Sequence, residues 1–257
     1  MKFVTLNISQ RIATITLNRP EKRNALNSEL VQQLAQTFEE AASDTEAKLV
    51  ILKAEGKAFC AGADLAYLQQ LQQNSYQENL EDSQQLKQLF QQIYTFPKPV
   101  IAQVQGHAIA GGCGLATVCD FVFSVPEAKF GYTEVKIGFI PAIVMTFLLR
   151  KIGEGKTKQL LLTGNLIPAE KAQSLGLINY IVENKYLNEQ VAAFARQMIE
   201  ENSGQSLTTT KQMIHRLQEM GLEDGLNYAA EMNAKARELE DCQKGIAAFL
   251  NKEKPTW

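Results

Sequence analysis

The sequence predicts an α/β protein in which the core is followed by a helical C-terminal region. Two observations support this fold class. Segments with the pattern of short strands alternate with amphipathic helical segments through the first part of the chain, and from about residue 185 onward nearly every segment has helical spacing. We therefore expect a core domain over residues 1–195 and a helical region over residues 196–257.

The first expected elements are a hairpin, a helix and a strand. Residues 3–8 and 11–17 alternate apolar and polar side chains around a short turn, which predicts two paired strands. Residues 27–29 (NSE) offer caps for a following helix. The apolar face of that helix would consist of Leu30, Leu34, Phe38 and Ala41. Residues 48–54 (KLVILKA) have the composition of a short buried strand.

The middle of the chain predicts helices and further strands. Residues 69–92 are dense in glutamine, but their apolar residues follow a helical spacing, which indicates a solvated helix pair. The segments PVIAQVQG and DFVFSV are expected strands on either side of AIAGGCGL. Pro141 and Pro168 suit the first positions of helices, and LINYIV predicts a late strand.

Composition narrows the class of protein. Of 257 residues, 45% are hydrophobic and 21% charged, which is typical of a globular protein. The net charge of −2 and the scattered basic residues give no reason to expect nucleic acid. The four cysteines lack metal-ligand spacing, so we expect reduced thiols and no metal. The strand-like opening MKFVTLNISQ and the absence of an apolar run of about 18 residues favour a cytoplasmic protein outside the membrane.

Two glycine-rich segments, FCAGADL (residues 59–65) and AIAGGCGL (residues 108–115), are the candidates for a site. Glycine costs backbone entropy and adds no packing, so each glycine in these segments is expected to permit a backbone conformation or a close approach that other residues would prevent. Gly111 and Gly112 fall near a predicted helix N-terminus, where backbone N–H groups are unpaired. Ala63 precedes Asp64 in a similar position. Either segment alone would indicate only a tight turn, whereas two N–H groups that converge on one oxygen form an oxyanion hole.

Five segments in order resemble the enoyl-CoA hydratase/isomerase (crotonase) superfamily over essentially the whole chain. They are LNRPEKRNALN, FCAGADL, GHAIAGGCGLATVCDFVFS continued by FGYTEVKIGFIP, LLTGNLIPAEKAQSLGLINYIV, and DCQKGIAAFLNKEKP. The resemblance implies a spiral of ββα units, a helical C-terminal trimerisation region, and a homotrimer or homohexamer. It also implies an acyl-CoA thioester substrate and no separate cofactor, because coenzyme A is part of the substrate.

The resemblance assigns the oxyanion-hole N–H groups to Ala63 and Gly111 and a catalytic carboxylate to Glu134. Typical hydratases of the family have a second glutamate at the position of Gly114. Glycine cannot transfer a proton, so Glu134 would act alone. Further substrate contacts implied by the resemblance are Arg23, Ala25, Ala61, Gly62, Asp64, Leu65, Tyr67, Gly112, Gly114, Tyr132, Pro141, Phe249 and Lys252, the last two at the coenzyme A of the same or a neighbouring subunit.

The leading hypothesis is a hydro-lyase that hydrates a short enoyl-CoA thioester, branched and carboxylated acyl chains included. Tyr67, GGCGL and EVKIGFIPAIV together look most like the bacterial methylglutaconyl-CoA hydratases. An enoyl-CoA isomerase that uses the same glutamate remains an alternative. So do other reactions of the fold, and a non-catalytic CoA- or RNA-binding subunit.

Several residues beside the expected site are interpreted as structural. His107, Cys60 and Cys113 lie close to the proposed donors, but no motif supplies the partner that a catalytic histidine or a nucleophilic thiol needs. The apolar segment PAIVM at residues 141–145, in place of a glycine-rich turn, predicts a reshaped acyl pocket. For Gly114 we expect room for a branched or carboxylated acyl group.

Overall fold

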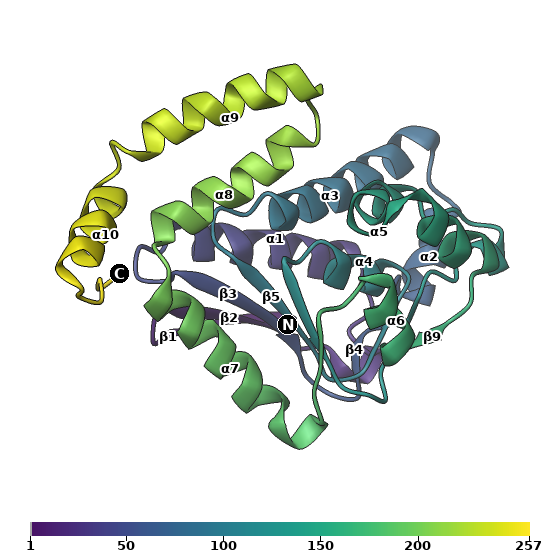
Figure 1. Ribbon diagram of the computed structural model, residues 1–257. Coiled ribbons are helices and arrows are strands. Elements are labelled where there is room, and N and C mark those ends of the chain that lie inside the picture. The colour runs from purple at the N-terminus through teal and green to yellow at the C-terminus, as the bar shows by residue number, and fades with distance from the viewer. Residues whose placement is uncertain (1) are drawn as a thin grey trace.

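The computed structural model describes residues 2–257 and contains two sheets covered by helices (Figure 1). The larger sheet has the strand order β1-β2-β3-β5-β7-β10. Its strands are β1 (Val4–Ser9), β2 (Ile12–Leu17), β3 (Leu49–Ala54), β5 (Val100–Val104), β7 (Phe121–Ser124) and β10 (Tyr180–Ile181). The pair β1–β2 is the antiparallel hairpin predicted at the N-terminus, and the other pairs are parallel.

A smaller sheet has the order β4-β6-β8-β9. Its strands are β4 (Ala58–Cys60), β6 (His107–Ile109), β8 (Lys129–Gly131) and β9 (Ile167–Pro168). The chain passes from a strand of the larger sheet to a strand of the smaller one and then to a helix, three times in succession. This repetition of ββα units confirms the expected spiral.

Local sequence features stabilise the helices of the core, as the first of them illustrates. The helices are α1 (Ser28–Ser43), α2 (Leu65–Leu71), α3 (Tyr76–Tyr94), α4 (Gly111–Thr117), α5 (Ala142–Thr163) and α6 (Ala169–Leu175), with 3-10 turns η1 (Pro20–Lys22) and η2 (Glu134–Ile137). The Asn27 side chain accepts a hydrogen bond from the Leu30 amide at 2.9 Å and caps α1 as expected. The predicted apolar face of α1 is buried.

The C-terminal part of the chain is helical, with α7 (Asn184–Glu201), α8 (Gly204–Leu217), α9 (Leu222–Ala236) and α10 (Glu240–Asn251). Helix α7 buries Leu187, Val191 and Ala195 against the core, so a boundary between residues 195 and 196 falls inside this helix. Helices α8 to α10 extend to one side of the sheets (Figure 1). No helix within residues 2–257 is long and apolar enough to span a membrane.

The structure differs from the expected elements at one place that matters for the site. Residues 100–104 do not lead directly into AIAGGCGL, because a turn at Gly106 and the short strand β6 intervene. A Cβ atom at Gly106 would lie 2.1 Å from the carbonyl oxygen of Lys57, so this turn requires glycine. Pro141 and Pro168 also precede α5 and α6 as N-cap residues rather than occupying their first turn.

Candidate active site

Three parallel strands of the smaller sheet each deliver one candidate segment. Strands β4, β6 and β8 run in the same direction, so their carboxyl ends meet at one edge of the sheet. Residues 61–64 follow β4, residues 110–114 follow β6, and residues 132–134 follow β8. In α/β proteins ligands bind outside the carboxyl ends of parallel strands. The topology therefore places all three segments where a ligand is expected.

Glycines let the first two segments approach each other. A Cβ atom at Gly62, where φ is +89°, would lie 2.9 Å from Cβ of Ala110 and 3.7 Å from the amide nitrogen of Gly111. A Cβ atom at Gly112 would lie 2.2 Å from the carbonyl oxygen of Cys60. Real Cβ atoms do not approach this closely, so both positions need glycine for close packing rather than for substrate contact alone.

The amides of Ala63 and Gly111 are available to a ligand. Neither donates a hydrogen bond to another backbone group of residues 2–257, and Ala63 is exposed while Gly111 is half-buried. Ala110 has φ 51° and ψ −125°, a conformation that alanine rarely adopts. Such strain persists where the surrounding structure imposes it, often at functional sites. Here it turns the chain so that α4 begins at Gly111.

Glu134 is positioned by the third segment. The Ala110 amide donates to the carbonyl oxygen of Gly131 at 2.7 Å, which joins the start of α4 to the end of β8. Glu134 begins η2 and is half-buried, and its Oε2 atom is buried without a hydrogen-bond partner among the described residues. Burial raises the pKa of this carboxyl, although a hydrogen bond from its own amide partly opposes the shift. A buried oxygen of this kind calls for a partner from outside the chain.

Asp64 is held inside its own loop. Its Oδ1 atom accepts hydrogen bonds from the amides of Ala66 at 2.9 Å and Tyr67 at 3.4 Å and so caps α2. Its Oδ2 atom lies 2.8 Å from Nη1 of Arg19, and both side chains are almost fully buried. Burial would raise the pKa of Asp64, but the Arg19 guanidinium and the two amides together hold it below its ordinary value. Asp64 thus organises the loop.

Arg19 is a site residue that the sequence reasoning missed. Besides its pairing with Asp64, its Nη1 atom donates to the carbonyl oxygen of Ala25 at 3.0 Å. An arginine before a proline in a loop carries no signal of its own, because most such side chains are solvated. Only the pairing with the buried carboxylate of Asp64 identifies it.

The loop that contains Arg23 and Ala25, two of the expected substrate contacts, lies beside the first candidate segment. The amide of Ala61 donates to the carbonyl oxygen of Arg23 at 3.1 Å, and that of Leu26 donates to the oxygen of Gly62 at 2.7 Å. The backbone amide of Asp64 donates in turn to the carbonyl oxygen of Leu26 at 2.8 Å. Residues 23–26 therefore run alongside residues 61–64, so the structure brings Arg23 and Ala25 next to the site.

Three other residues that were predicted to contact the substrate differ in their surroundings. Leu65 is exposed at the start of α2, and the Tyr67 hydroxyl is hydrogen-bonded to Asp82 of α3. Burial, with the Asp82 carboxylate as a second cause, raises the pKa of Tyr67 to about 12. Tyr132 is fully buried and its hydroxyl lies 2.6 Å from Oγ1 of Thr117, so it packs inside the core instead of facing a ligand.

Two predicted residues lie far from the site within one chain. Phe249 is exposed on α10 and Lys252 caps the end of the same helix. Helices α10 and α2 lie at opposite sides of the molecule (Figure 1). Pro141, by contrast, is buried and is the N-cap residue of α5. One chain therefore does not bring Phe249 and Lys252 to the three candidate segments.

The space beside Gly114 is occupied by protein. A Cβ atom at this buried position would lie 2.4 Å from Cγ1 of Val144 and 3.0 Å from Cε2 of Phe90. The expectation that Gly114 leaves room for an acyl branch is therefore wrong for this structure. The reason is that α5 packs directly against α4 and inserts Val144 into the gap.

The residues interpreted as structural behave as such. Nδ1 of His107 accepts a hydrogen bond from the amide of Lys129 at 3.1 Å, which fixes two neighbouring strands. Burial raises the pKa of Cys60 and of Cys113 to about 12, so neither forms a thiolate near neutral pH. Within residues 2–257, no group of three or more histidine, cysteine, aspartate or glutamate side chains could hold a metal ion.

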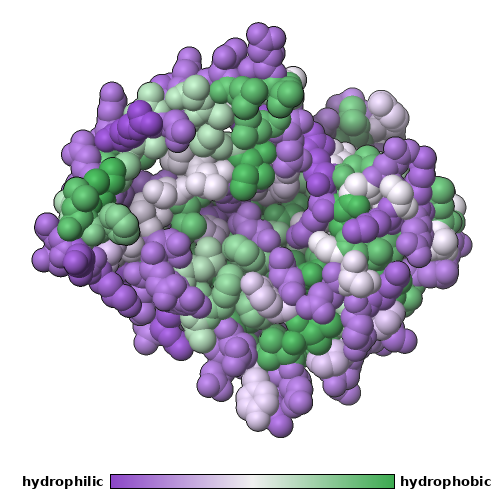
Figure 2. Space-filling view, in the orientation of Figure 1, coloured by the Kyte–Doolittle hydropathy of each residue, from purple (hydrophilic) through white to green (hydrophobic). Residues whose placement is uncertain are grey.

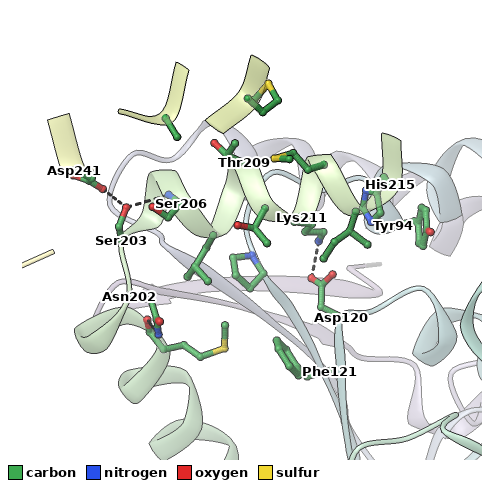
Figure 3. A pocket seen from close by; sticks show the side chains of 18 of the residues that line it. Tyr94, Asp120, Phe121, Asn202, Ser203, Ser206, Thr209, Lys211, His215 and Asp241 are labelled. Atoms are coloured by element: carbon green, nitrogen blue, oxygen red, sulfur yellow. Dashed lines mark hydrogen bonds and ion pairs between the residues drawn. The ribbon is translucent and has the colours of Figure 1, made fainter. Parts of the chain in front are cut away.

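A cavity of about 940 Å³ lies elsewhere, between the core and the C-terminal helices. Along its walls, Figure 3 shows Lys211 of α8 paired with Asp120 and Ser203 hydrogen-bonded to Asp241. Nζ of Lys211 lies 2.6 Å from Oδ2 of Asp120, and the Ser203 hydroxyl donates to Oδ2 of Asp241 at 2.6 Å. Apolar side chains gather on this face near the C-terminal helices, around a hollow (Figure 2). None of Ala63, Gly111 and Glu134 lines this cavity, so it is separate from the candidate active site.

Comparison with known proteins identifies the family. The sequence model of the family described as enoyl-CoA hydratase/isomerase matches residues 7–257. A Thermus thermophilus protein described as an enoyl-CoA hydratase is 44% identical over 95% of this chain and 96% of its own length. The 2,3-dehydroadipyl-CoA hydratase of Escherichia coli is 33% identical over 99% of this chain and 98% of its own.

A solved structure agrees with the sequence comparison. A Legionella pneumophila protein described as an enoyl-CoA hydratase/isomerase (crotonase) superimposes with a TM-score of 0.91. It is 36% identical, and the match covers 99% of this chain and 98% of that one. Fold, sequence and the arrangement of three segments at the carboxyl ends of β4, β6 and β8 therefore lead to one conclusion: the chain belongs to the enoyl-CoA hydratase/isomerase family and is an enzyme of that family.

Proposed function

We propose that this enzyme adds water to short enoyl-CoA thioesters, with the amides of Ala63 and Gly111 as oxyanion hole and Glu134 as the single acid–base group. The observation that carries the proposal is the buried, unpartnered Oε2 atom of Glu134, in the segment that adjoins two amides without backbone acceptors. A carboxylate and two donors of this kind are the groups that hydration of a conjugated thioester needs.

In the proposed reaction the thioester oxygen accepts hydrogen bonds from Ala63 and Gly111. A water molecule bonded to Glu134 attacks C3 of the acyl chain, the double-bond electrons move toward the thioester oxygen, and Glu134 takes a proton from the water. The same carboxyl then delivers a proton to C2. One C–O bond and one C–H bond form, and Glu134 is again ionised.

Burial of Glu134 suits it to both halves of this reaction. Because burial raises its pKa, the carboxylate is a better base toward water and its protonated form persists long enough to return the proton. Asp64 cannot replace it, since its carboxylate is bonded to Arg19 and to two amides. Gly114 supplies no acid.

Isomerisation is the second candidate, because one carboxylate can also move a proton from C4 to C2. We favour hydration because the two sequence relatives reported above, from Thermus thermophilus and Escherichia coli, are described as hydratases. A subunit that only binds coenzyme A or RNA would gain nothing from a buried carboxylate oxygen without a partner, since such an oxygen destabilises the fold.

For the acyl group we propose a short chain, with the carboxylated methylglutaconyl-CoA as one member of the class. Its support is the sequence resemblance together with the E. coli relative, which is named for a dehydroadipyl substrate that also carries a distal carboxylate. The test is a panel of crotonyl-CoA, 3-methylglutaconyl-CoA and 2,3-dehydroadipyl-CoA with product identification by mass spectrometry. A product heavier by one water supports hydration, whereas a shifted double bond at unchanged mass supports isomerisation.

We also propose that the chain assembles into a trimer or hexamer. Its C-terminal helices expose large apolar side chains, and such exposed patches mark interfaces. They are Ile214, Leu222, Leu226, Ile246, Phe249 and Leu250. Assembly could also bring Phe249 and Lys252 to the coenzyme A of a neighbouring subunit. Light scattering tests the proposal, and a monomer at micromolar concentration would contradict it.

A further inference from the structure

Position 114 is closed by two side chains from other helices. Gly114 lies in α4 with ordinary negative φ, and a Cβ atom there would lie 2.4 Å from Cγ1 of Val144 and 3.0 and 3.3 Å from two ring carbons of Phe90. Val144 is buried in the first turn of α5, and Phe90 is fully buried in α3. Both are packed into the core and cannot move aside cheaply.

The same position belongs to the walls of the proposed reaction site. Gly111 and Gly114 are three residues apart and lie on one face of α4. Val144 belongs to α5, which contacts both α4 and η2, the turn that begins at Glu134. The charge of Glu134 contributes to the raised pKa of Cys113, next to Gly114, although burial is the larger cause.

We propose that Val144, together with Phe90, occupies the space that a side chain at position 114 would need, and so limits the site to the single carboxylate of Glu134. The Val144 side chain fills the volume into which any side chain at position 114 would extend, so Glu134 carries out the proton transfers alone. Gly114 and Val144 thus form a matched pair, in which neither residue can change freely without the other. This inference rests on the proposed function only for its catalytic consequence, since the packing can be tested without substrate.

The first test replaces Gly114 by alanine, because the position of Val144 decides whether this substitution stabilises or destabilises the fold. In a helix, alanine is more favourable than glycine where space is open. Gly155 is the control, because it is exposed in the part of α5 that follows the non-helical Gly153 and has nothing within 4 Å of its would-be Cβ atom. We expect Gly155→Ala to leave the thermal midpoint unchanged or raise it by about 2 °C, and Gly114→Ala to lower it by roughly 3 °C or more.

In a protein that already carries Val144→Ala, the effect of Gly114→Ala on the thermal midpoint should reverse from a decrease to an increase. Removing Cγ1 and Cγ2 opens a cavity and lowers the midpoint, and adding Ala at 114 then fills part of that cavity. We expect the double variant to melt higher than Val144→Ala alone. A Gly114→Ala protein that melts at or above the wild type, or a double variant that shows the two losses simply added, would overturn the proposal.

The second test is catalytic and uses pH. Gly114→Glu alone should fold poorly or melt far below the wild type, whereas Gly114→Glu combined with Val144→Gly should recover most of the loss. If position 114 faces the reaction site, the pH profile of kcat/KM for crotonyl-CoA should gain a second ionisation in that double variant. A folded double variant that retains the single ionisation of the wild type would refute the placement of position 114. Failure of the proposed hydration would instead appear as a wild type without any hydrated product.

Discussion

Replacing Glu134 by glutamine should separate the chemistry of the site from its stability. Glutamine keeps the shape of the side chain but cannot exchange a proton. General acid–base groups contribute about 10²- to 10⁴-fold to rates. Since Asp64 is held by Arg19 and Gly114 supplies no carboxyl, no second group compensates, and we expect a loss near 10⁴-fold in kcat. This corresponds to about 5 kcal/mol in the activation free energy.

The same substitution should stabilise the fold at neutral pH. Burial raises the pKa of Glu134 above its ordinary value, so the folded state binds this proton more tightly than the unfolded state. The stabilisation from the protonated carboxyl is complete below the unfolded pKa and is lost as the pH rises through the folded pKa. At neutral pH the wild type therefore carries a buried, unpartnered charge that the Glu134→Gln protein lacks.

The assays are direct. Hydration of crotonyl-CoA is followed by product analysis, and stability by the thermal midpoint at pH 4 and pH 7.5. We expect the Glu134→Gln midpoint to exceed that of the wild type at pH 7.5, and the difference to shrink at pH 4. A variant that retains more than about a tenth of the activity, far above the general acid–base range, or that melts below the wild type at pH 7.5, would refute the reasoning.

Three further outcomes are expected from the contacts of the site. Gly111→Pro removes the amide donor at the first position of α4, a helix position that accepts proline once Cδ1 of Leu26, 3.0 Å from the new Cβ atom, shifts slightly. It should lower kcat by about 10²- to 10³-fold; near-normal activity in a protein with wild-type circular dichroism would contradict this. Arg19→Met leaves Asp64 buried without its cation and should cost about 3–5 kcal/mol of unfolding free energy. The contribution of that pair is present above the unfolded pKa of Asp64 and is lost as the pH falls through the lower folded pKa, so the difference in unfolding free energy between the two proteins, measured by urea titration, should be smaller at pH 3 than at pH 7. Cys113→Ala should retain most of the activity, because burial raises the pKa of this thiol to about 12; a dead variant would reveal a missed nucleophile.

The sequence predicted the long elements well because their patterns are local. The hairpin β1–β2 follows from alternation, and α1 follows from its Asn27 cap and its apolar face. The smaller sheet could not be found in this way, since β4, β6 and β8 have three residues each and show no period. Their pairing, which assembles the site, depends on residues about fifty and twenty positions apart.

The site was predictable where glycine or a family motif marked it. The segments around Ala63, Gly111 and Glu134 were named from the sequence, and the structure places them at one edge of one sheet. The contacts between Val144 and Gly114 and between Arg19 and Asp64 join distant parts of the chain and leave no pattern in it. For that reason the sequence suggested open space at Gly114, where the structure has a packed side chain.

The most direct test of the proposed mechanism is the reaction of crotonyl-CoA in water labelled with ¹⁸O, with the product analysed by mass spectrometry. If Glu134 activates water for attack at C3, the wild type should give 3-hydroxybutyryl-CoA with the label in its hydroxyl group, and Glu134→Gln should give almost none. An unlabelled product with a shifted double bond, or the same labelled yield from Glu134→Gln as from the wild type, would contradict hydration by this single carboxylate.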